Sequence, residues 1–261
     1  ADLSVVVASA PGTDVRAAGV LVLARRDKHA PLPHWGVHPS VAWALGEVAR
    51  LAPSEVVVDP CAGVAGLLLE LARHWPACRF LGIDQDPAQI RRARQNVRSM
   101  GAAVRLELAD SAAMPLQDAS VDVVISDLPY GRQHGSVEGN AAFYPRLLAE
   151  VARVLRADGR AVLLTGAECG HLLRAAAAAA GLPAVAEVPL KFGGNMDGLD
   201  CVLLCLGRGR SAHQGAFNLA VGGGSLAGAE RWHIVEKWRY LKPLLQPVPS
   251  LRRPPGARGA G

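Results

Sequence analysis

The chain has 261 residues, half of them hydrophobic, and a formal net charge of +5. That length and apolar fraction suffice for a buried core, and no window reaches about 18 apolar residues without a charge or a glycine, which argues against a membrane span. The N-terminus lacks the basic start of a secretory signal, so an intracellular location, cytoplasmic or nuclear, is expected.

Residues 1–37 contain two short β-like runs, 3–9 and 19–26, followed by a loop that two prolines interrupt. We interpret this part as connecting strands and a loop, because it is too short for a domain. The chain begins with alanine rather than methionine, so we expect a processed product or a part of a longer protein.

From residue 38 the pattern changes to short apolar runs that alternate with amphipathic segments. Such alternation predicts an α/β fold, a doubly wound and mostly parallel sheet with helices on both faces, over residues 38–208. The last two strands have no helix between them and should form an antiparallel hairpin at one sheet edge. Seven strands with this ending are typical of Rossmann-like class I methyltransferases. The expected helices are 39–52, 66–75, 87–100, 144–156 and 169–181, and the expected strands are 55–59, 79–84, 104–110, 121–127, 160–165, 184–191 and 200–207.

Residues 209–261 form a C-terminal extension that we expect to be partly disordered. Its aromatic and basic segment 231–245 suits either stacking on RNA bases or a helix that packs on the domain. The loop 191–200 should border the substrate pocket. The five cysteines include no C-x-x-C pair, so no metal site is expected.

The positive charge suits a polyanionic partner such as nucleic acid. For the basic segment 91–98, however, we prefer a solvated helix face, and for the tail a disordered segment. His34, Trp35 and His38 resemble a small site, but surface or helix-start positions are the favoured interpretation.

Three acids end successive predicted strands, where ligands bind in open α/β sheets. Asp59 precedes a turn with Gly63 and Gly66, Asp84 follows about 20 residues later, and Asp110 ends the third strand. Glycines let a ligand approach the backbone closely, and a carboxylate can accept both hydroxyl protons of a ribose. This set suits S-adenosyl-L-methionine, with a cationic amino-acid end, a ribose and an adenine. The alternative is that all three acids are helix caps or turn residues.

The fourth strand ends in Asp127, Leu128, Pro129 and Tyr130. Methyl transfer to an exocyclic amine requires acceptors for the amine hydrogens, which the Asp127 carboxylate and the Leu128 carbonyl offer. Pro129 fixes the turn, and Tyr130 can stack on the base. We therefore expect these four residues to be catalytic. The competing interpretation is a helix-capping turn with a surface tyrosine.

Several motifs together resemble the catalytic domain of THUMP-domain-containing RNA guanosine N2-methyltransferases over about residues 38–207. They are "HPSVAWAL", "VVVDPCAGVAGLLLELA", "FLGIDQDP", "LADSAAMPLQDASVDVVISDLPYG" and "FYPRLLAEVARVLRADGRAVLLT". The resemblance implies methyl transfer from S-adenosyl-L-methionine to guanosine N2 in tRNA or a small nuclear RNA. It assigns the methionine end to Asp59 and Gly63, the ribose to Asp84, and the adenine to Asp110 and Ser111. The full set of expected cofactor-binding residues is Asp59, Cys61, Gly63, Gly66, Asp84, Gln85, Asp110, Ser111 and Asp127.

The resemblance also implies partners: an RNA, and a small zinc-binding activator subunit that adds to an exposed strand edge. Two departures stand out. Ala65 occupies a position where the family usually has glycine. This would weaken cofactor binding if that position requires a positive φ, unless the neighbouring Gly66 supplies the conformational freedom. The RNA-binding THUMP domain is absent from this sequence, and residues 1–37 resemble only the strands that follow it.

Two other functions remain open. One is methylation of another amine, a DNA adenine or a protein glutamine, although the acid at 127 argues against an adenine enzyme. The other is a catalytically weak remnant that binds RNA or a protein.

Overall fold

The computed structural model describes residues 2–7, 20–24, 32–130, 136–192, 199–207 and 232–234. Its helices are α1 (Pro39–Ala49), α2 (Gly66–His74), α3 (Pro87–Met100), α4 (Val137–Val154), the 3-10 turn η1 (Ala167–Cys169) and α5 (Gly170–Ala179). Its strands are β1 (Asp2–Val7), β2 (Val20–Ala24), β3 (Val56–Asp59), β4 (Arg79–Asp84), β5 (Val104–Leu108), β6 (Val121–Asp127), β7 (Leu155–Gly166), β8 (Ala184–Phe192), β9 (Leu199–Gly207) and β10 (Trp232–Ile234).

The strands form one sheet in the order β2-β1-β10-β8-β9-β7-β6-β3-β4-β5. Strands β3 to β7 pair in parallel, whereas β9 is antiparallel to both β7 and β8. The predicted seven-stranded α/β unit and its terminal hairpin are confirmed. The prediction that this hairpin ends the sheet is wrong, because β10 pairs with β8 and β1 pairs with β10.

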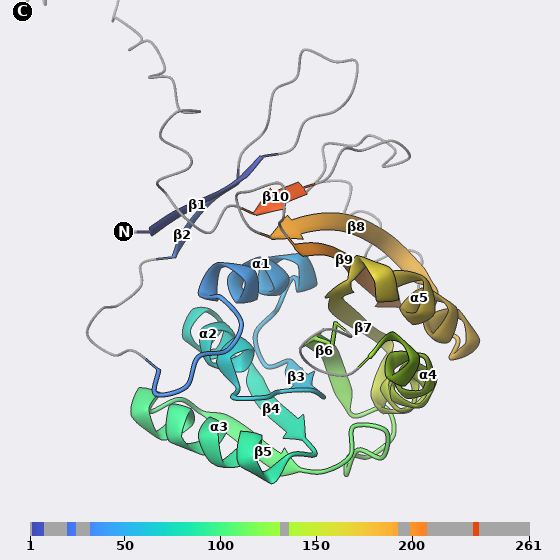
Figure 1. Ribbon diagram of the computed structural model, residues 1–261. Helices are drawn as coiled ribbons and strands as arrows, with labels where there is room; N and C mark the ends of the chain where they lie inside the picture. Colours follow the sequence, from blue (N-terminus) through green and yellow to red (C-terminus); the bar gives the residue numbers. More distant parts are fainter. Residues whose placement is uncertain are drawn as a thin grey trace, which may run out of the picture.

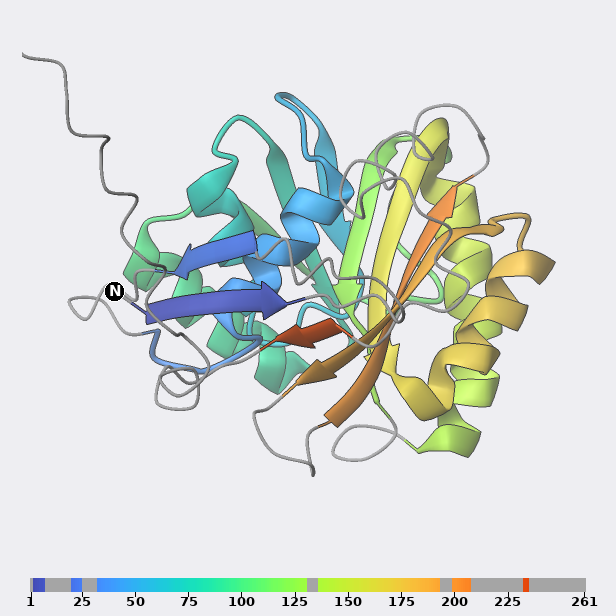
Figure 2. The same cartoon turned by 90° about the horizontal axis from the view of Figure 1, so that it is seen from above.

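Helices cover both faces of the central strands, as Figure 1 and the view from above in Figure 2 show. Helices α1, α2 and α3 lie on one face, and α4 and α5 lie on the other. Each side has its own apolar core, one including Leu68 and Ile125 and the other including Tyr144 and Leu163. Both cores contain β6 residues, because successive side chains of a strand point to opposite faces. Strand β6 is therefore held from both sides.

Helix α3 begins and ends where the sequence predicts. The Asp86 side chain accepts a hydrogen bond from the Ala88 N–H at 2.7 Å, and Pro87 occupies the first helical position. Gly101 ends the helix with φ of 61°, a left-handed conformation that glycine adopts without strain.

Helix α4 starts seven residues before the predicted start at residue 144. The Ser136 hydroxyl caps it by accepting the Gly139 N–H at 3.0 Å. The prediction took Pro145 as a first-turn residue, but this proline lies inside the helix. The added turns bring the start of α4 to the carboxyl end of the sheet, where its side chains become available to a site.

The amino end of the sheet is held by Arg160. Its guanidinium contacts both carboxylate oxygens of Glu55, at 2.7 and 2.8 Å, and donates to the carbonyl oxygens of Ala49 and Arg50. Both partners of the ion pair are largely buried, with 12% and 18% of the side chains exposed. This bidentate contact joins the end of α1, the start of β3 and β7 on the side opposite the carboxyl ends.

Of segment 231–245, only Trp232–Ile234 is described, and it is a strand rather than a helix. Most of the loop 191–200 lies outside the described residues. All five cysteines are free thiols. Within the described ranges, no helix is long and apolar enough to cross a bilayer, and no group of three His, Cys, Asp or Glu side chains is placed to hold a metal ion.

Candidate active site

A cavity of about 1160 Å³ lies at the carboxyl ends of the strands. Its walls come from the ends of β3, β4 and β6, the turn before α2, the start of α4 and residues 35–37. Pockets for drug-sized ligands typically measure about 300 to 1,000 Å³, so this cavity has room for a cofactor and part of a second molecule.

Asp59 forms the floor of the cavity at the tip of β3. Its Oδ1 accepts hydrogen bonds from the Cys61 N–H at 3.0 Å and the Ser126 hydroxyl at 2.6 Å, and only 2% of the residue is exposed. Burial and, to a smaller extent, the neighbouring carboxylates of Asp127 and Asp84 raise the pKa of Asp59 to about 7, although these two hydrogen bonds lower it. A cation bound close to Asp59 would therefore stabilise its ionised form.

Asp84, at the tip of β4, lies beside the glycine turn. One carboxylate oxygen accepts the Gly63 N–H at 2.8 Å, and the other accepts the Asp86 N–H at 2.9 Å. Gly63 has φ of 52°, and a Cβ at this position would meet no atom within 4 Å. The turn consequently presents bare backbone to the cavity, and each Asp84 oxygen keeps a lone pair for a ligand hydroxyl.

Ala65 adopts the left-handed conformation, with φ of 62° and ψ of 20°, and is fully buried. The position does require the positive φ that the family's glycine would supply. Gly66 does not take over this role, because it is the first residue of α2 and serves close packing. A Cβ on Gly66 would lie 3.2 Å from the Gly36 Cα and 3.4 Å from the Val37 nitrogen. The contact brings residues 35–37 against the cavity wall.

Asp110 and Ser111 follow β5, but only Ser111 lines the cavity. The Asp110 carboxylate accepts the Ala112 N–H at 2.8 Å and forms an ion pair with Arg146 at 3.0 Å. The interpretation of the strand-end acids as turn residues is thus partly right. Asp59, Asp84 and Asp110 each accept the N–H two residues on, and the first two also face the cavity.

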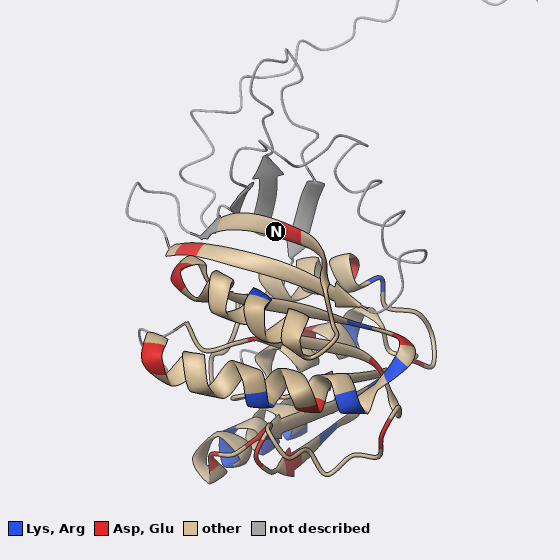
Figure 3. Ribbon diagram, turned by 90° about the vertical axis from the view of Figure 1, so that its right-hand side faces the viewer, with Lys and Arg blue, Asp and Glu red and all other residues tan. Residues whose placement is uncertain are grey.

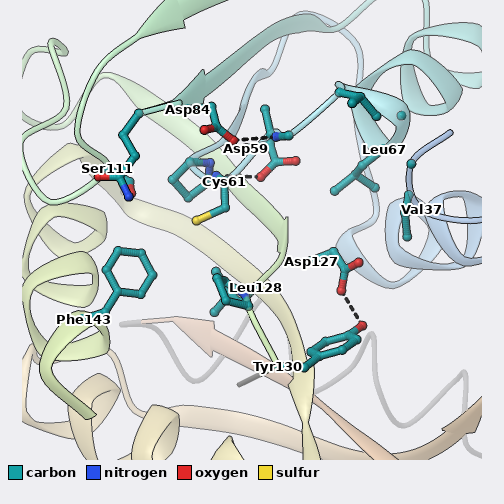
Figure 4. A pocket seen from close by; sticks show the side chains of 18 of the residues that line it. Val37, Asp59, Cys61, Leu67, Asp84, Ser111, Asp127, Leu128, Tyr130 and Phe143 are labelled. Atoms are coloured by element: carbon teal, nitrogen blue, oxygen red, sulfur yellow. Dashed lines mark hydrogen bonds between the residues drawn. The ribbon is translucent and has the colours of Figure 1, made fainter. Parts of the chain in front are cut away.

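Asp127 and Tyr130 lie opposite the glycine turn and form a pair. The tyrosine hydroxyl donates to Asp127 Oδ1 at 2.5 Å, and both residues are half-buried. Burial raises the pKa of Asp127 to about 6, although the hydrogen bond from Tyr130 lowers it. Tyr130 is therefore not the surface tyrosine of the competing interpretation. Figure 4 shows the pair on one side of the space and Asp59 with Asp84 on the other.

A buried polar network fixes the turn between these two residues. The Pro129 carbonyl oxygen accepts hydrogen bonds from Asn140 at 2.8 Å and from the Tyr144 hydroxyl at 2.9 Å. Tyr144 also contacts the Thr165 hydroxyl at 2.8 Å, and all three side chains are buried. Because buried polar groups need partners, this network holds the turn in one conformation.

The cavity is electrostatically one-sided. Three carboxyl groups, Asp59, Asp84 and Asp127, line it, while no lysine, arginine or histidine does so among the described residues. Burial favours the protonated forms of Asp59 and Asp127, and repulsion from the neighbouring carboxylates adds to this effect at Asp59. A pyrophosphate would be repelled here, whereas a ligand with positive charges and hydroxyl groups would be accepted.

The sequence reasoning missed several wall residues. Asn140 and Phe143 belong to the part of α4 that lies before the predicted helix start at residue 144, so no helical position was assigned to them. Trp35 lines the cavity mouth although 61% of it is exposed. His38 does lie at a helix start, since its carbonyl accepts the Val41 N–H at 2.9 Å.

A comparison with known proteins identifies the family of the domain. The family model described as UPF0020, an RMKL-like methyltransferase domain, matches residues 33–196. The chain belongs to this family. The matched range contains the ends of β3, β4 and β6 that line the cavity. The family is one of methyltransferase domains, as expected from the fold and the strand ends.

Relatives of the UPF0020 domain include RNA-modifying enzymes. The chain is 33% identical over 148 residues to a Bos taurus protein named U6 snRNA (guanine-N(2))-methyltransferase THUMPD2. It is 31% identical over 151 residues to a Mus musculus protein named tRNA (guanine(6)-N(2))-methyltransferase THUMP3. These matches cover 56% and 51% of this chain but only 29% and 30% of the relatives' length.

Among solved structures, TrmN from Thermus thermophilus superposes with a TM-score of 0.57 at 24% identity. The superposition covers 74% of this chain and 55% of TrmN. It supports the class I methyltransferase fold that the sequence predicted.

Proposed function

We propose that this chain transfers a methyl group from S-adenosyl-L-methionine to the N2 amine of guanosine in an RNA. The observation that carries the proposal is the cavity in which the Asp127-Leu128-Pro129-Tyr130 turn faces the glycine turn and its acids. The names of the two guanine-N2 methyltransferase relatives support the choice of base and RNA.

The residues at the glycine turn fit S-adenosyl-L-methionine. A methionine ammonium and a sulfonium would offset the negative charge of Asp59 and Asp127. The raised pKa values of both residues reflect the cost of burying that charge. The Asp84 oxygens can accept ribose hydroxyl protons, and the bare Gly63 backbone lets the ligand approach. Bound there, the cofactor supplies an electrophilic methyl group. Contacts from Gln85, Asp110 and Ser111 to the adenine remain predictions.

The Asp127 turn would hold the guanine amine. With Oδ1 engaged by Tyr130, the second carboxylate oxygen and the Leu128 carbonyl are the acceptors for the amine hydrogens. Orientation of the nitrogen lone pair is the main requirement of the reaction, and a turn fixed at Pro129 meets it. The raised pKa of Asp127, about 6, also suits it to take the proton that the nitrogen loses on methylation.

We further propose the boundaries and partners of the unit. Residues 38–208 would be the catalytic domain, 1–37 its connecting strands and 209–261 an extension, in an intracellular enzyme. Strand β5 ends the sheet among the described strands, so its outer edge offers a place for a strand of the zinc-binding activator subunit.

The test is a methylation assay with labelled cofactor on tRNA and U6 snRNA, with and without the activator subunit, followed by digestion to nucleosides. The proposal expects N2-methylguanosine, and its loss in Asp127→Ala. Labelled N6-methyladenine in DNA or methylglutamine in protein would instead support another amine as substrate. If no methylated product forms under any condition but calorimetry still shows binding of S-adenosylhomocysteine, the chain is the catalytically weak remnant described above.

A further inference from the structure

Four arginines of α3 are exposed and without a counter-charge. Arg91, Arg92, Arg94 and Arg98 are all exposed, and none of them forms an ion pair with any residue in the described ranges. After the cap residue Asp86, the helix contains no acid. It therefore presents four positive charges to solvent.

Most arginines elsewhere in the described fold behave differently, although Arg73 and Arg79 are also exposed and form no ion pair within the described ranges. On α4 and α5, which face the viewer in Figure 3, basic and acidic positions occur together on the helices or on their neighbours. The arginines that form ion pairs are Arg105, Arg146, Arg153, Arg156, Arg160 and Arg174. Among the described helices, α3 is thus the one on which several exposed arginines without an ion pair gather.

Three of the four arginines share one side of the helix. Arg91, Arg94 and Arg98 are spaced three and four residues apart, which aligns them over about 10 Å of the axis. Like charges at these spacings destabilise a helix by about 0.2 to 0.5 kcal/mol for each pair. A helix face that contacts only solvent is not stabilised by this arrangement. Guanidinium groups in a row match the phosphates of a nucleic acid strand.

The basic helix is joined directly to the cavity rim. Asn96 is fully buried, and its side chain accepts the His34 N–H at 3.0 Å and donates to the carbonyl oxygens of His34 and Val64, both at 2.9 Å. The His34 ring also contacts Gln95 on the exposed side of α3. Trp35, the next residue along the chain, lines the cavity mouth. The arginine row and the rim consequently form one continuous unit.

We propose that Arg91, Arg94 and Arg98 bind the sugar-phosphate backbone of the RNA that leads to the target nucleotide. The inference rests on the proposed function and adds the surface on which its substrate docks. Backbone contacts of this kind give affinity and position without sequence selection, while the cavity selects the base. It replaces the solvated-face interpretation of segment 91–98.

The test is the triple variant R91Q/R94Q/R98Q of the full chain, since glutamine keeps helix propensity and removes the charge. RNA binding is measured by fluorescence anisotropy with labelled tRNA over a series of salt concentrations. We expect an affinity loss of about tenfold or more at low salt, and a salt dependence reduced by roughly two to three in slope. Calorimetry with S-adenosylhomocysteine should show unchanged cofactor binding.

The matched control is R105Q/R156Q/R174Q, which removes the same charge from exposed arginines that are ion-paired. We expect it to retain most of the affinity and the salt slope. Equal losses in the two variants would overturn the inference, because net charge alone would then explain them. So would a chain that binds no tRNA, or a triple variant that keeps RNA affinity and loses a protein partner. RNA binding without N2-methylguanosine would overturn only the proposed function.

Discussion

Replacing Asp59 by asparagine should stabilise the protein while impairing its cofactor site. The pKa of Asp59 is raised from 3.8 to about 7, mainly by burial. Each pKa unit corresponds to about 1.4 kcal/mol, so ionising this carboxyl costs up to about 4 kcal/mol of folding free energy at pH 8. Asparagine removes the charge, and its Oδ1 can still accept from the Cys61 N–H and the Ser126 hydroxyl.

The sign of the pH dependence follows from the direction of the pKa change. Because the folded-state pKa of Asp59 lies above the unfolded value, the native state binds more protons between pH 3.8 and about 7. Stability is therefore unaffected by this group below that window and is progressively lost as the pH rises through it. Asp59→Asn should leave the free energy of unfolding nearly unchanged near pH 4 and increase it most near pH 8.

Urea unfolding of the ligand-free protein from pH 4 to 8 measures this effect, with the exposed Asp158→Asn as control. A difference between Asp59→Asn and the native protein that does not grow with pH would refute the reasoning. Calorimetry at pH 8 completes the test. The same variant should bind S-adenosyl-L-methionine more weakly, because a neutral amide replaces the carboxylate that faces its positive charge.

Further predictions concern the two turns of the cavity. Asp127→Ala should reduce kcat about 100-fold or more with little change in the cofactor Kd. Asp84→Ala should instead raise the cofactor Kd first. Equal loss of cofactor affinity in the two variants would contradict the assigned roles. In the native enzyme, kcat/KM for the RNA should fall about tenfold per pH unit below pH 6, as Asp127 becomes protonated, and a flat pH profile would exclude it as the acceptor. Tyr144→Phe removes a buried hydroxyl with two hydrogen bonds and should cost about 1 to 3 kcal/mol in urea unfolding. Ala65→Gly relieves about 1 to 2 kcal/mol of strain from the left-handed conformation. It also removes a buried methyl group and increases the entropy of the unfolded state, and both effects oppose the gain. The free energy of unfolding should therefore change by less than about 1 kcal/mol.

The strand ends were predictable because the chain alternates strongly between apolar strands and helices. Asp59, Asp84 and Asp127 are each the last residue of a strand whose sequence alone marks its end. In a parallel sheet those ends meet at one edge, so three residues far apart in the sequence could be assigned to one site. The positive φ of Ala65 was foreseeable from the same turn, as the position where glycine was expected.

The remaining features depend on contacts between distant segments. Asn140 acts through a backbone carbonyl of the β6 turn, and no local pattern indicates which carbonyl a buried amide will meet. Asp110 was assigned to the cavity by its place after a strand, but the strand ends two residues earlier and Arg146 of α4 takes its carboxylate. The pairing of β10 with β8 joins two strands that are about 40 residues apart in the sequence. No local sequence pattern indicates such a pairing.

The Arg160–Glu55 contact places a principal polar support of the fold at the amino end of the sheet. The acids whose ionisation costs stability lie at the other end, in the cavity. Stabilising substitutions can therefore be sought around the amino end without the loss of activity that usually accompanies them near a catalytic site. An engineered variant could gain heat resistance there and keep an unaltered substrate preference.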